Sequence, residues 1–170
     1  LDDDEIMSFR RMGSPCQGHV DMDWTDGVDF SAGSLGMGMS FGLGCAIAAR
    51  MDSSDRNIWV MIGDGETQEG QVWEAAMAAS FHNATNLKVI VDRNRIQNDD
   101  FVDIQMEIGD IASKFSSFGW NAREVDGQDM VELVEATEWA SQEASAHAAL
   151  SASTTTDEGA PSSGATPHYH

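Results

Sequence analysis

The chain has 170 residues, of which 41% are hydrophobic, enough for one domain with a hydrophobic core but not for two large domains. Its 29 aspartates and glutamates outnumber 9 lysines and arginines, giving a formal net charge of -20. This balance excludes nucleic-acid binding through clustered basic side chains. No apolar stretch is long enough to span a membrane and no signal-peptide pattern is present, so we expect a cytoplasmic protein.

The acidic composition also bears on the salt concentration in which the protein works. Self-repulsion destabilises such an anionic fold at low ionic strength, whereas molar salt shortens the Debye length to roughly 3 Å. We therefore interpret the composition as halophilic, with an ordinary solubilising surface as the simpler alternative. The two cysteines, Cys16 and Cys45, lie far apart and outside any metal-binding spacing, so neither a disulfide framework nor a zinc site is indicated.

The first predicted elements lead to a strand near the middle of the chain. Residues 1–13 resemble the end of a helix, so we expect the chain to begin inside a domain. A turn-rich segment follows, and then a helix at about residues 35–51 with Ser31 or Ser34 as its cap. Residues 57–62, "NIWVMI", are apolar and β-branched, which predicts a buried parallel strand.

The rest of the chain continues the alternation of helix and strand. Helices are predicted at about 70–82, 108–118 and 130–143, and strands at 86–92 and 121–126. The alternation predicts an α/β fold with a doubly wound parallel sheet and helices on both faces. Residues 145–170 are small, polar and aperiodic. We therefore divide the chain into a domain over residues 1–144, with its beginning missing, and a low-complexity, disordered tail over 145–170.

Oxygen-bearing side chains follow the first two predicted strands. Asp64 follows the first strand, and Asp92 and Asn94 end the second. Ligands of doubly wound sheets bind beyond the carboxyl ends of the strands, where a βαβ unit brings Asp64 and Asn94 together. A carboxylate, an amide oxygen and a backbone carbonyl are ligands suited to Mg²⁺ or Ca²⁺, with waters and phosphate oxygens completing the shell.

Glycines flank this aspartate on both sides. Gly63 and Gly65 would allow a phosphate to approach the backbone closely, because they carry no β-carbon. The simpler alternative is a turn aspartate that accepts hydrogen bonds from its own backbone.

Longer stretches of the sequence carry a family resemblance. "GDGETQEGQVWEAAMAAS", followed by "VDRNRIQND", is similar to the thiamine-diphosphate motif in its transketolase form. "FRRMGSPCQGHVDM", "GVDFSAGSLGMGMSFGLGCAIAAR" and "FGWNAREVDGQDM" match the same family. The chain thus resembles the amino-terminal, thiamine-diphosphate-binding half of transketolase over roughly residues 6–144.

The resemblance implies thiamine diphosphate and Mg²⁺ as cofactors, with Ca²⁺ as a substitute. Asp64, Asn94 and the carbonyl of Ile96 would bind the metal. The residues expected to contact the cofactor are Gly33, Leu35, Gly63, Asp64, Gly65 and Asn94, with Gly65 against the diphosphate and Gly33 and Leu35 near the rings.

The resemblance also implies roles beyond the cofactor. His19 matches a histidine that reaches the substrate, Glu69 a glutamate that links two active sites across a dimer, and Glu74 a member of the same relay. Glu66 is expected to be a solvated surface charge.

The implied activity is the transfer of a two-carbon ketol unit between sugar phosphates. In the family, the glutamate that activates the cofactor comes from a separate pyrimidine-binding domain, which this sequence lacks. We therefore predict that the chain alone is inactive and needs a carboxy-terminal transketolase subunit in a homo- or hetero-oligomer. The alternatives are a catalytically dead fragment or interaction module, and another thiamine-diphosphate enzyme such as deoxyxylulose-phosphate synthase or a 2-oxoacid dehydrogenase component.

Overall fold

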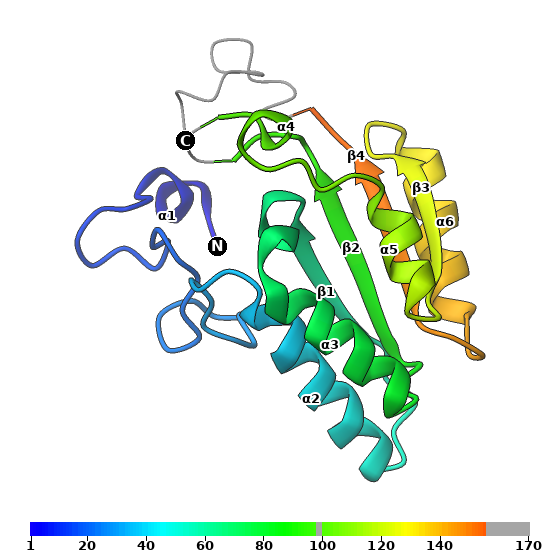
Figure 1. The fold of residues 1–170 in the computed structure, drawn as a ribbon. Coiled ribbons are helices and arrows are strands. Elements are labelled where there is room, and N and C mark those ends of the chain that lie inside the picture. The colour runs from blue at the N-terminus through cyan, green and yellow to red at the C-terminus, as the bar shows by residue number, and fades with distance from the viewer. Residues whose placement is uncertain (98–99, 156–170) are drawn as a thin grey trace.

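Four parallel strands form one sheet in the order β1-β2-β4-β3 (Figure 1). The structure, a computed structural model, describes residues 1–97 and 100–155. The strands are β1 (Ile58–Gly63), β2 (Leu87–Arg93), β3 (Asn121–Asp126) and β4 (Ala148–Ser153). With helices on both sides of this sheet, the predicted α/β class is confirmed.

Six α-helices and one 3-10 helix lie in the described part of the chain. They are α1 (Asp3–Met7), α2 (Met37–Met51), η1 (Gly65–Gln68), α3 (Gly70–Phe81), α4 (Val102–Gln105), α5 (Ile111–Ser117) and α6 (Met130–Gln142). No helix in this described part is both long and apolar enough to cross a lipid bilayer.

The cap predicted for α2 is wrong. Gly36 is the N-cap, in the left-handed region at φ 79°, and no side chain forms a capping hydrogen bond with the helix. Instead, the carbonyl of Ser34 accepts a hydrogen bond from Met37 N at 3.3 Å. Glycine suits this position because other residues rarely adopt a positive φ.

Two hydrophobic clusters cover the two faces of the sheet. Side chains of α2, α3 and α5 pack with Val89 and its neighbours, whereas those of α6 pack with Ile90 on the opposite face, as alternation along a strand requires. The contact between α2 and β1 is especially close, since a β-carbon at Gly42 would lie 2.3 Å from Val60 Cγ2. The packed layers fix the carboxyl ends of the strands, where the polar loops lie.

The structure corrects the prediction that residues 145–170 form a disordered tail. Residues 148–153 form β4, which lies between β2 and β3 and pairs Leu150 with both Ile90 and Arg123. Alanine and serine have weak strand preference, but small side chains fit a strand enclosed by neighbours on both sides. The sheet therefore extends beyond residue 144, and the rest of the predicted tail, residues 156–170, lies outside the described residues.

Candidate cofactor and metal site

Asp64 follows β1 directly and joins the two loops at the carboxyl edge of the sheet. Gly63 is paired with Asp92 in the β1–β2 register, and Asp64 N donates to Asp92 O at 3.0 Å. The Asp64 side chain accepts from Gly65 N at Oδ1 and from Arg95 N at Oδ2, both at 2.8 Å. Since the residue is only 2% exposed, its carboxylate is held mainly by backbone amides.

Burial raises the pKa of the Asp64 carboxyl above its ordinary value of 3.8. Hydrogen bonds from Arg95 N and Gly65 N act in the opposite direction, and the nearby charge of Asp92 adds to the rise. A carboxylate removed from water is destabilised unless hydrogen bonds or a positive charge compensate. A divalent cation beside Asp64 would supply that charge.

Asn94 is oriented by its neighbours along the second loop. Its Nδ2 donates to Asp92 Oδ2 at 2.9 Å, and its Oδ1 accepts from Ile96 N at 2.9 Å. The hydroxyl of Thr154, just after β4, donates to the other oxygen of Asp92. With its donor side turned to Asp92, Asn94 retains a free lone pair on Oδ1 for a cation.

Most of the predicted site residues line one cavity of about 350 Å³. These are Leu35, Gly63, Asp64, Gly65, Glu69, Asn94 and Ile96. A carboxylate, an amide oxygen and backbone carbonyls form the all-oxygen set that Mg²⁺ and Ca²⁺ prefer. Nowhere in residues 1–97 and 100–155 do three or more His, Cys, Asp or Glu side chains gather for a metal. A cation at this edge would therefore depend on amide, backbone and ligand oxygens as well as Asp64.

Gly65 is enclosed on one side by the second loop. A β-carbon at this position would lie 2.9 Å from Gln97 Oε1, so a larger residue would displace Gln97. The absence of a side chain keeps the turn after β1 close to the loop after β2.

His19, Gly33 and Glu74 are not among the residues that line this cavity. His19 lies against Gly33, since a β-carbon on Gly33 would be 3.3 Å from His19 Cγ, and both residues are exposed. Gly33 lies two positions before Leu35, which does line the cavity. Glu74 is exposed on α3.

The expectation that Glu66 is a solvated charge is wrong. Its Oε1 accepts from Gly36 N at 2.7 Å, and its Oε2 accepts from Gly63 N at 3.1 Å. Gln71 Nε2 donates to Leu35 O at 2.9 Å, which adds a second contact to the same segment. These contacts join segments far apart in the sequence, and no local pattern indicates them.

The orienting role of Asp92 is not among the sequence predictions, although a sequence signal for it exists. Asp92 stands two positions before Asn94, and alternate residues near a strand end point to the same side. The sequence does not predict the role of Thr154, because it gives no sign of β4, which Thr154 follows.

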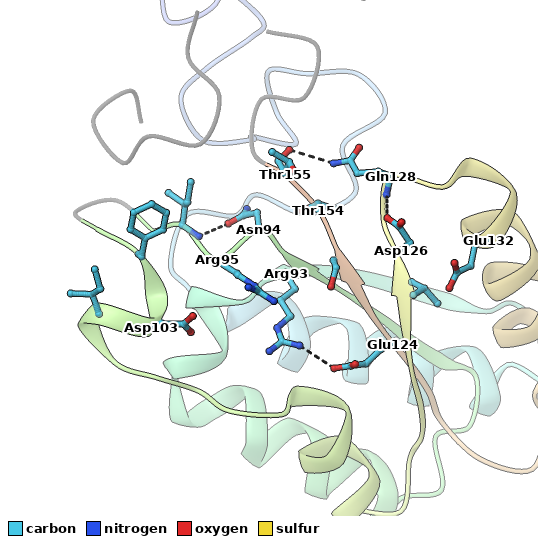
Figure 2. Close-up of a pocket in the computed structure, with 15 residues that line it drawn as sticks. Arg93, Asn94, Arg95, Asp103, Glu124, Asp126, Gln128, Glu132, Thr154 and Thr155 are labelled. Carbon is cyan, nitrogen blue, oxygen red and sulfur yellow. Dashed lines mark hydrogen bonds and ion pairs between the residues drawn. The ribbon is translucent and has the colours of Figure 1, made fainter. Parts of the chain in front are cut away.

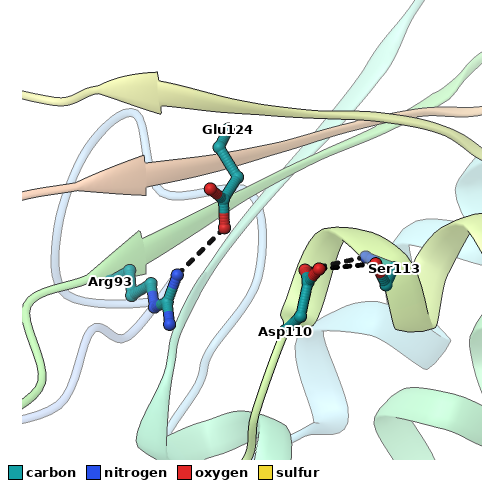
Figure 3. Close-up of polar contacts among 4 residues, drawn as sticks. All are labelled: Arg93, Asp110, Ser113 and Glu124. Atoms are coloured by element: carbon teal, nitrogen blue, oxygen red, sulfur yellow. Dashed lines mark hydrogen bonds and ion pairs between the residues drawn. The ribbon is translucent and has the colours of Figure 1, made fainter.

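A second cavity, of about 1020 Å³, lies at the carboxyl ends of β2, β3 and β4 (Figure 2). It shares Asn94 and Ile96 with the first cavity. Arg93 Nη1 lies 3.0 Å from Glu124 Oε1, an ion pair that joins β2 to β3 across β4 (Figure 3). No sequence pattern predicts this cavity, because β4 builds one of its walls.

Comparison with known proteins identifies the family. The model for "Transketolase, thiamine diphosphate binding domain" matches residues 1–170. The chain is 38% identical over 133 residues to a 6-deoxy-6-sulfo-D-fructose transketolase subunit of Clostridium sp. (strain MSTE9), covering 78% of this chain and 48% of the relative. It is 37% identical over 122 residues to one subunit of the apulose-4-phosphate transketolase of Phocaeicola vulgatus, covering 72% and 43%. The chain thus spans about half the length of these relatives.

The fold leads to the same family. The crystal structure of transketolase from Campylobacter jejuni superposes with a TM-score of 0.88 at 27% identity, over 96% of this chain and 27% of that chain. The sheet and the loops at its carboxyl edge lie within residues 1–170, which the family model matches. This chain therefore belongs to the transketolase family and corresponds to its thiamine-diphosphate-binding domain.

Proposed function

We propose that this chain supplies the thiamine-diphosphate- and Mg²⁺-binding part of a transketolase that moves a two-carbon ketol unit between sugar phosphates. The observation that carries the proposal is the convergence of Asp64, Asn94 and Ile96 on one cavity at the ends of β1 and β2. When bound, thiamine diphosphate supplies the carbon nucleophile for breaking and forming the carbon–carbon bonds. The chain's own residues bind and orient the cofactor and the substrate.

Asp64, Asn94 Oδ1 and the Ile96 carbonyl are the proposed protein ligands of the metal. Their oxygens suit Mg²⁺, and Ca²⁺ as a substitute, with waters and diphosphate oxygens completing the coordination shell. The metal would also reverse the local sign of charge, so that a chain with net charge -20 can hold an anionic diphosphate. Gly63 and Gly65 keep the backbone accessible beside it.

Leu35, Gly33 and His19 are the proposed contacts for the rings and the substrate. Leu35 lines the cavity and is 55% exposed, so it offers apolar surface to a ring. Gly33 leaves room for a close approach, and the imidazole of His19 lies beside it. We assign His19 to hydrogen bonding with substrate oxygens, a role that a neutral or charged imidazole can perform.

Glu69, Glu74 and the exposed face of α3 are the proposed contacts with a second subunit. Glu69 precedes α3 and lines the cavity, whereas Glu74 lies on the exposed side of the helix. Met77 and Phe81, on following turns of the same side, are 50% and 85% exposed. Exposed apolar side chains grouped in this way are typical of an interaction surface.

The proposed partner is a carboxy-terminal transketolase subunit, in a homo- or hetero-oligomer. Two relatives are named as transketolase subunits, which supports the proposal that this chain is also one part of a divided enzyme, inactive alone. We further propose a cytoplasmic setting and, from the net charge of -20, adaptation to high salt.

Reconstitution tests this function. The chain is mixed with a carboxy-terminal transketolase subunit, sought in the adjacent reading frame, and supplied with a ketose phosphate, an aldose phosphate, thiamine diphosphate and Mg²⁺. We expect transfer only when both subunits and both cofactors are present, and none when Asp64→Ala replaces the wild-type chain. Full turnover by this chain alone, or turnover independent of thiamine diphosphate, would contradict the proposal.

A further inference from the structure

Glu66 connects the end of β1 with Gly36, which lies 30 positions before Glu66 in the chain. One carboxylate oxygen accepts from Gly36 N at 2.7 Å, and the other accepts from Gly63 N at 3.1 Å. The side chain is half-buried, and each of its oxygens has a backbone partner. Glu66 is therefore part of the wall of the cavity rather than a free surface charge.

The Gly36 end of this contact lies at the start of α2. Gly36 is the N-cap of this 15-residue helix and offers no capping side chain, and the first turn of α2 has no acidic residue. Backbone amides at a helix start favour a negative partner. The Glu66 carboxylate brings a negative charge to the start of α2 from the other segment.

A second side chain holds the same segment. Gln71 Nε2 donates to Leu35 O at 2.9 Å, and a β-carbon on Gly36 would lie only 2.9 Å from Gln71 Cγ. Through these hydrogen bonds, Glu66 and Gln71 hold Leu35 and Gly36 against the segment that starts at Gly63. Because Leu35 and Asp64 line the same cavity, these contacts determine the spacing between its two sides.

We infer that Glu66 is a positioning residue that holds the segment 33–36 at a fixed distance from the Gly63–Gly65 turn. The inference rests on the proposed function, in which Leu35 contacts the cofactor rings and Asp64 binds the metal and diphosphate. Glu66 then aligns the ring-contacting side of the site with the diphosphate side before the cofactor binds. Such preorganisation improves affinity by reducing the ordering needed on binding.

The chemistry of the side chain makes the inference testable. A carboxylate has two acceptor oxygens for two N–H donors, whereas an amide has one oxygen and presents its NH₂ group to the other donor. Glu66→Gln therefore breaks one of the two contacts with little change of volume. Gln71→Met removes the contact with Leu35 O and leaves Gly63 untouched, so it tests the same alignment separately.

The experiment compares thiamine diphosphate with inorganic pyrophosphate, each titrated with Mg²⁺ into the full chain by calorimetry. Pyrophosphate contains only the diphosphate part and does not need the ring-contacting side. We expect Glu66→Gln and Gln71→Met to raise the Kd for thiamine diphosphate about tenfold and to leave the Kd for pyrophosphate within about twofold. Glu135→Gln, an exposed change on α6, is the matched control and should alter neither Kd.

Amide hydrogen exchange provides a readout that requires no cofactor. In Glu66→Gln, exchange should accelerate about tenfold relative to wild type at the amide that loses its acceptor, either Gly36 or Gly63, whereas amides in β4 should keep their rates. An equal loss of affinity for both ligands, or unchanged exchange rates at both the Gly36 and the Gly63 amides, would overturn the inference. Failure of the wild-type chain to bind either ligand would instead count against the proposed function, while the exchange rates would still decide the role of Glu66.

Discussion

The two ends of the sheet both contain buried ionisable side chains, but they differ in what surrounds them. At the carboxyl edge, Asp64 is bound by two backbone amides and lines a cavity together with Asn94 and Ile96. At the amino edge, Lys88 is fully buried at the start of β2 and donates to Glu143 O at 2.5 Å. Burial lowers the pKa of Lys88, just as burial raises the pKa of Asp64.

His147 completes the contrast at the amino edge. It is buried, its ring centroid lies 4.7 Å from that of Trp120, and its Nε2 has no hydrogen-bond partner among the described residues. Burial lowers its pKa below the ordinary 6.5. A perturbed pKa alone therefore does not mark a site; the distinguishing feature of the carboxyl edge is the gathering of oxygens from separate loops around an open cavity.

The largest effect is expected from replacing Asp64 at the carboxyl edge, with Lys88 at the amino edge as the comparison. Asp64→Ala should weaken Mg²⁺-dependent binding of thiamine diphosphate by at least about 100-fold, because it removes a carboxylate that we propose as a direct metal ligand. Lys88→Met should leave that affinity unchanged, because it replaces a buried cation at the start of β2, which does not line the cavity, with an apolar chain of similar volume. Calorimetric titration measures both, and equal losses in the two variants would remove the distinction between the edges.

A second prediction distinguishes the role of Glu69 from that of Asp64 at the same carboxyl edge. Glu69→Ala should lower kcat of the assembled enzyme on the order of 100-fold, if Glu69 acts with the partner subunit. Its Mg²⁺ affinity should remain close to that of wild type, because Glu69 is exposed and is not a proposed ligand. A parallel loss of Mg²⁺ affinity would assign Glu69 to the metal site instead.

Salt should affect the whole fold rather than one edge. With a net charge of -20, the melting temperature should rise by several degrees between low and molar KCl, as screening weakens self-repulsion. The same rise is expected in Lys88→Met and Asp64→Ala. A flat melting profile in scanning calorimetry would refute the halophilic interpretation.

The smallest effect is expected at the amino edge, from the protonation of His147. Its pKa is lowered in the folded chain, so the unfolded state binds the proton more readily and stability falls as pH decreases below 6.5. Between about pH 7.5 and about 5.5, wild type should lose about 1 kcal/mol more unfolding free energy than His147→Gln. Urea titrations at both pH values measure this difference, and identical losses would show that His147 does not titrate on unfolding.

Much of the fold could be predicted from the sequence where periodicity and composition agree. The apolar runs of β1 and β2 and the strand at 121–126 lie where the pattern indicates them, and α3 begins at Gly70 as expected. The strand β4 could not be predicted, because "AALSAS" has no β-branched residue and its extended form depends on β2 and β3 beside it.

The candidate site shows the same division between local and long-range information. Asp64, Asn94 and Ile96 follow strands, so the topology of a parallel sheet predicts that they meet. The contact of Glu66 with Gly36 depends on how α2 and its preceding turn lie against η1. The residues next to Glu66 in the sequence do not indicate that packing. Thr154 depends on β4 in the same way.

The most direct test of the central claim is the uptake of Mn²⁺, a paramagnetic substitute for Mg²⁺, in the presence of thiamine diphosphate. Electron paramagnetic resonance at molar KCl follows the loss of the free-ion signal while salt suppresses diffuse binding to the acidic surface. We predict that wild type and Lys88→Met take up the ion equally and that Asp64→Ala and Asn94→Ala do not. Equal uptake by all four proteins would contradict the assignment of the carboxyl edge as the metal and cofactor site.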